Sequence, residues 1–146
     1  MRWLVDLLRS DRGQTVLIMP FAFLIVLSIG AVTLEAGNLH LRQRQLDDLA
    51  DSIASDAAAV GFDTEQFRAD GSIRINLARA EAVIDPAIGI SNLPDATPAG
   101  ISVTTGGEAI EITLNYTHEF ILGRQVFGSS QTLTATGNAT LVPSQP

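Results

Sequence analysis

The side chains that could do acid–base or metal chemistry are few. The sequence holds two histidines, His40 and His118, and no cysteine, which removes a thiolate nucleophile and any Cys-ligated metal centre. His118 stands beside Glu119 in a segment that alternates like a strand, so these two side chains point to opposite faces of a sheet and form no pair. A zinc site needs at least one more convergent ligand. We therefore expect both histidines to be exposed polar residues.

Two further patterns have simpler explanations than a ligand site. Asp47, Asp48 and Asp51 could bind a cation, but a solvated helix face accounts for them. Gly106-Gly107 fits a hairpin turn and not a phosphate loop, because no lysine and no strand-to-helix context follow it. The sequence thus predicts a protein that is not an enzyme and has no metal, no cofactor and no small-molecule substrate.

Composition points to a membrane protein. Of 146 residues, 46% are hydrophobic and only 17% charged, and the net charge of −7 makes nucleic acid an improbable partner. Thr15–Leu34 is a run of 20 residues without a charge, which as a helix spans roughly 30 Å, the thickness of the hydrocarbon core of a bilayer. A cleavable secretory signal is the alternative, but its apolar region is usually shorter. We expect a transmembrane helix over residues 14–35.

Residues 1–13 are expected to form a cytoplasmic leader. Arg2, Arg9 and Arg12 place the N-terminus in the cytoplasm by the positive-inside rule. Trp3 and the leucines near it share one face of a short helix that would lie at the membrane surface. The rest of the chain is then extracytoplasmic.

The helix is expected to continue outside the membrane over residues 36–61. Apolar residues recur there at helical steps and Gly61 supplies a stop, while Gly37-Asn38 leaves a hinge open. Small residues in or near the membrane add surfaces for close helix contact. The predicted helix-packing residues are Gly30, Gly37, Leu39, Leu46, Ala50, Ile53, Ala57 and Val60.

Residues 62–146 are expected to form a small α+β domain. Asp63 begins a capping pattern for a short helix, and Ile73 with Ile75 suggests a short strand. Asn76 could cap a helix over 77–84 that Pro86 ends, with a loop over 88–100. Three alternating segments follow, at Ile101–Val103, Ile110–Thr117 and Thr132–Val142, which we expect to form an antiparallel sheet of about three strands. That sheet would pack on the outer half of the long helix.

Residues 12–61 carry a motif-level likeness to a known family. Arg12-Gly13 precedes the apolar run, Glu35-Ala-Gly37-Asn-Leu39 ends it, and the stretch from Arg42 to Ala54 includes Leu46, Ala50 and Asp51. In these residues the chain resembles the TadE/TadG-like proteins of the tight-adherence (Flp) pilus assembly system. Glu35 stands where the family usually has Asp, and Leu49 where it usually has Ala.

The resemblance implies a pilin-like fold and a single-pass protein of the bacterial cytoplasmic membrane. It would act in pilus assembly and adhesion, as a minor pseudopilin or an assembly factor, with pilus subunits, assembly proteins or its own copies as partners. It also places a prepilin-type cleavage site at Gly13-Gln14, although Ile18 stands where such substrates carry Glu, so cleaved and uncleaved forms both stay open. The alternative function is a signal-anchored extracytoplasmic binding or scaffolding module unrelated to pili.

Overall fold

The computed structural model describes residues 11–104, 106–121, 124 and 128–141, with side chains from residue 18 onward. The surface helix expected around Trp3 lies outside the described residues. The elements are α2 (Asp11–Gly61), α3 (Thr64–Asp70), α4 (Leu77–Gly89), β1 (Thr97–Val103), β2 (Ala109–Glu119) and β3 (Ser130–Thr140). The protein is therefore of the α+β class, with a long N-terminal apolar helix and a small three-stranded antiparallel sheet.

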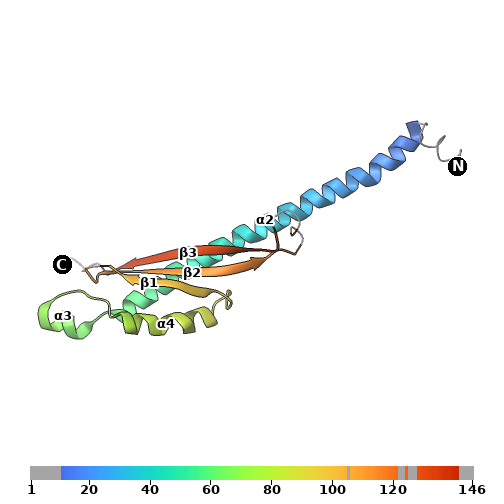
Figure 1. The fold of residues 1–146 in the computed structure, drawn as a ribbon. Helices are drawn as coiled ribbons and strands as arrows, with labels where there is room; N and C mark the ends of the chain where they lie inside the picture. Colours follow the sequence, from blue (N-terminus) through green and yellow to red (C-terminus); the bar gives the residue numbers. More distant parts are fainter. Residues whose placement is uncertain (1–10, 105, 122–123, 125–127, 142–146) are drawn as a thin grey trace.

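Helix α2 is one uninterrupted element of 51 residues, and its N-terminal half projects beyond the rest of the protein (Figure 1). Neither Pro20 nor the Gly37-Asn38 pair breaks it. The projecting part is apolar and exposed: the exposed fraction is 68% for Phe21, 55% for Ile25 and 62% for Ile29. Within the described residues, α2 is long and apolar enough to cross a membrane, and its apolar 18-residue window has a mean hydropathy of 2.1.

The three strands form an antiparallel sheet in the order β1-β2-β3. β1 is an edge strand, and its register shifts between Pro98 and Gly100. The expected loop over 88–100 is therefore wrong in its last residues, which belong to β1 from Thr97 onward. Proline lacks an N–H for the ladder and is tolerated at an edge, most of all beside such an irregularity. The proline and glycine concealed this strand from the sequence pattern.

Helix α4 also differs from its expected bounds, because it runs through Pro86 to Gly89. Asn76 caps it as expected, its side chain accepting a hydrogen bond from the Arg79 N–H at 3.3 Å. Ile84 and Ile88 are both buried, four residues apart on one face. Burial of Ile88 outweighs the single helix hydrogen bond that Pro86 removes.

The short strand expected at Ile73 and Ile75 is not a strand. Ile75 makes only an isolated bridge to Phe62. The Ile75 side chain is nevertheless buried, and its N–H donates to the Gly107 carbonyl at 2.8 Å. This segment therefore joins the end of α2 to the β1–β2 turn, where Gly107 has a φ of 78°.

The core lies between the outer half of α2, the sheet and α4 (Figure 1). Alternate residues of β2 and β3 face α2, while α4 packs along another side of the same helix. The buried residues that α2 contributes are Leu46, Ala50, Ile53, Ala54, Ala57 and Ala58, and those of the sheet include Ile110, Ile112, Leu114, Leu133 and Ala135. Helix α2 is thus both the projecting apolar rod and the centre of the domain.

Candidate functional site

The predicted helix-packing residues divide into two groups. Leu46, Ala50, Ile53 and Ala57 are buried against the chain's own sheet and α4, and Leu39 is partly buried against the same core. They form the internal face of α2. Gly30 and Gly37 are exposed, and an added Cβ would meet nothing within 4 Å at either position.

Val60 does not join this internal face, because 53% of it is exposed. The neighbouring Gly61 is buried instead. On a 3.6-residue period, positions 60 and 61 fall on opposite flanks of the row of Ala50, Ile53 and Ala57. The chain packs on the flank of Gly61, where an added Cβ would meet Ile75 and Ala80. Ala54 and Ala58, on the same flank as Gly61, complete the buried face.

The residues that carry the family likeness are spread along α2. Arg12, Gly13 and Gln14 lie in its first turns, where the structure describes the backbone only. Asp51 is exposed on the outer face, next to the buried Ala50. Glu35 is buried, with only 6% of its surface exposed.

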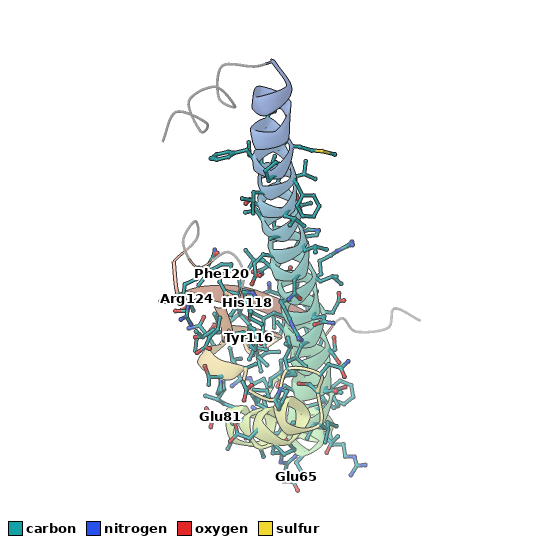
Figure 2. All side chains as sticks on the ribbon, turned by 90° about the vertical axis from the view of Figure 1, so that its right-hand side faces the viewer. Glu65, Glu81, Tyr116, His118, Phe120 and Arg124 are labelled. Carbon is teal, nitrogen blue, oxygen red and sulfur yellow. The ribbon has the colours of Figure 1, made fainter. Side chains whose placement is uncertain are left out.

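Glu35 and His118 form a buried pair where α2 enters the domain. Nε2 of His118 lies 3.6 Å from Oε1 of Glu35, and each side chain is less than a tenth exposed. The ring of His118 also makes an edge-to-face contact with Phe120, with the ring centres 5.2 Å apart. Figure 2 shows His118 and Phe120 at the end of the domain nearest the projecting helix. The expectation that His118 is exposed is therefore wrong.

Glu35 ties the end of β2 to the helix through a backbone bond as well. The N–H of Ile121 donates a hydrogen bond to Oε1 of Glu35 at 3.1 Å. Among the described residues, Nε2 of His118 has no acceptor within hydrogen-bond distance. The carboxylate of Glu35, 3.6 Å from that nitrogen, is within ion-pair distance but beyond hydrogen-bond distance. The pair acts as a polar latch between α2 and β2.

The described surroundings of the latch are mainly apolar and form no metal centre. No group of three His, Cys, Asp or Glu side chains within the described residues could hold a metal ion. An open hollow of about 280 Å³ borders the pair and is lined mainly by apolar surface; its lining residues are Leu34, Glu35, Asn38, His118, Glu119 and Ile121. The arrangement is suited to holding two elements together at the foot of the domain.

The alternation of β2 and the helical period of α2 both held a signal for the latch. His118 continues the alternation of Ile110, Ile112 and Leu114, so it belongs to the face of β2 that packs on α2. Glu35 lies four residues before Leu39, on the same stripe of the helix. Relating these two patterns would have placed both residues in the interface.

Comparison with protein-family models, with curated proteins and with solved structures finds no match for this chain.

We expect Glu35→Ala to destabilise the domain by about 3 kcal/mol, since it removes the acceptor of the Ile121 N–H and the carboxylate that lies against the buried His118 ring. Glu35→Gln keeps a carbonyl oxygen that can accept from Ile121, so its loss should be smaller. The stability losses of the two variants are measured by urea unfolding of the full chain in detergent micelles, and separately by hydrogen exchange of the β2 and β3 amides.

Glu119→Gln is the matched control, because Glu119 is the exposed neighbour on the other face of β2. Its stability should stay within about 0.5 kcal/mol of the parent chain, as is usual for surface changes. Equal stability of Glu35→Ala and Glu119→Gln would show that the latch has no structural effect.

Proposed function

We propose that this chain is a membrane-anchored structural component of a tight-adherence type pilus, acting as a minor pseudopilin or as an assembly factor. Its N-terminus lies in the cytoplasm, α2 crosses the cytoplasmic membrane once, and the α+β domain is extracytoplasmic. It works through helix packing and protein–protein contacts with pilus subunits or assembly proteins.

The exposed apolar half of α2 is the observation that carries this proposal. In residues 18–34 every Phe, Leu and Ile is more than half exposed, although such side chains are normally withdrawn from water. A helix that is hydrophobic all round needs lipid or other helices on every side. Because the same helix continues into the core without a break, a movement of the apolar half of α2 in the membrane also moves the domain.

The two exposed glycines support contact with a partner helix. Gly30 and Gly37 are seven residues apart, so they share one face of α2, which is roughly opposite the face of Ala50. Small residues on a membrane helix let another backbone approach closely. As the chain's own domain leaves this face uncovered among the described residues, a separate protein can pack there.

Deletion of the gene in the bacterium that encodes it should abolish pili seen by electron microscopy, and the parent gene should restore them. Gly37→Leu should fail to restore them while the protein accumulates normally, because a Cβ there meets nothing within 4 Å and the bulk of leucine would block a partner's approach. Asn38→Leu, at the next exposed position, is the control for added bulk. Normal pili in the deletion strain would refute the proposal.

The N-terminus of the mature protein separates the two roles. Mass spectrometry of sheared filaments and of washed membranes identifies it in each fraction. A chain that starts at Gln14 in the filaments is a processed minor pseudopilin. A chain that starts at Met1 and stays in the membrane is an uncut assembly factor.

A further inference from the structure

An exposed apolar residue and an exposed basic residue follow β2 at the foot of the domain. Ile121 is 84% exposed and Arg124 is also exposed; together we call them the ledge. In Figure 2, Arg124, Phe120 and His118 lie toward the end of the domain nearest the projecting helix, and Glu81 and Glu65 lie farther along the molecule.

The ledge lies at the level where the apolar part of α2 ends. The N–H of Ile121 is bonded to the carboxylate of Glu35, the residue that directly follows Leu34. Side chains on a helix lean toward its N-terminus, so the Glu35 carboxylate reaches back toward the apolar run. The backbone of Ile121 is therefore held at the depth of the last apolar turn.

The apolar surface is continuous from the helix to the ledge. Leu34, at 70% exposure, and Ile121 line the same open hollow. The described residues leave both side chains largely exposed, although both stand next to the segment that needs lipid. Contact with the boundary between headgroups and acyl chains would cover both at once.

The charges near the ledge suit a phospholipid surface. Residues 36–46 of α2 contain Arg42 and Arg44 and no acidic residue, while Asp47, Asp48, Asp51 and Asp56 come later, farther from the apolar run. Glu119 and Asp95 border the larger hollow beside Arg42, so the site is not uniformly basic. Arginine binds phosphate oxygens in a bidentate manner, which favours the headgroup level for Arg42, Arg44 and Arg124.

We propose that the ledge docks onto the phospholipid headgroups of the bilayer that α2 crosses, giving the domain a second membrane contact and fixing its orientation about the helix axis. This inference rests on the proposed membrane anchoring and adds to it the surface that faces the lipid. The latch of Glu35 and His118 holds the ledge in place.

Because the sequence has no cysteine, single cysteines can be spin-labelled in the full chain. Three variants are reconstituted in vesicles of phosphatidylethanolamine and phosphatidylglycerol: Ile121→Cys, Ile90→Cys and Ile25→Cys. Ile90 is the matched control, since it is an isoleucine that is 90% exposed. It follows α4, and the next residue, Ser91, lines a hollow with Gln45 and Leu49 of α2, farther from the apolar run than Glu35. Accessibility to oxygen and to a water-soluble nickel chelate reports the depth of each label.

We expect the ratio of oxygen to nickel accessibility at residue 121 to be severalfold higher than at residue 90, and highest at residue 25. Equal, water-like ratios at 121 and 90, with 25 in lipid, would overturn the ledge while membrane anchoring stands. Protection of residue 121 from both reagents would show a protein contact and would also overturn it. A water-like label at residue 25 would refute the membrane anchoring itself.

Discussion

A fragment comprising residues 62–146 will not fold, because its core lies on α2. Leu46 and Ile53 are completely or almost completely buried, and each contributes about 1.5–3 kcal/mol through burial. Removing α2 also exposes Ile110, Ile112 and Leu114 on the sheet, at a similar cost for each. The combined loss, about 7–15 kcal/mol, is as large as the whole 5–15 kcal/mol that typically separates folded from unfolded domains. Far-UV circular dichroism and amide NMR should therefore show a disordered chain.

Residues 35–146 form the matched control. This fragment keeps the outer half of α2 and Glu35 and lacks the apolar run, so we expect a soluble protein with dispersed amide signals. A dispersed spectrum from residues 62–146 alone would contradict the expectation. It would also favour an autonomous binding module over a domain built on its anchor.

Gly137→Val should have the next largest effect, although valine is a much better strand former than glycine. Gly137 is buried in β3 where that strand crosses α2, and a Cβ there would clash with the backbone of Ala50 and lie 2.6 Å from the Asp51 nitrogen. A flexible side chain could move aside, but two backbones cannot. We expect a loss of more than about 3 kcal/mol, at or beyond the upper end for overpacking.

The measurement is urea unfolding of the full chain in micelles, with hydrogen exchange of β3 amides. Gly100→Val is the control, since Gly100 lies in edge strand β1 and a Cβ there meets nothing within 4 Å. Its stability should change by less than about 1 kcal/mol. If the two variants are equally stable, the close approach of β3 to α2 is not needed for the fold.

Much of the secondary structure could be predicted from local patterns. The uncharged run from Thr15 to Leu34 and the stripe after it predict one long helix, and α2 has this form. The period of two predicts β2 and β3 to within two or three residues. The Asp63 and Asn76 caps are also as expected, since both depend only on neighbouring residues.

The misplaced elements are those in which tertiary packing outweighs local preference. β1 contains Pro98, and α4 passes through Pro86, because an edge position and a buried Ile88 make these prolines acceptable. Neither the edge position of β1 nor the burial of Ile88 can be predicted from the residues next to each proline.

The sequence by itself determined the apolar anchor, its continuation into an amphipathic helix and the alternation of the strands, because each depends on the order of residues along one element. Only the tertiary structure decided that His118 meets Glu35 and that Gly137 crosses Ala50. These contacts join residues more than 80 positions apart, at a register set by how the sheet packs on the helix. A pattern within one element cannot specify that register, because it is fixed by the shapes of both surfaces together.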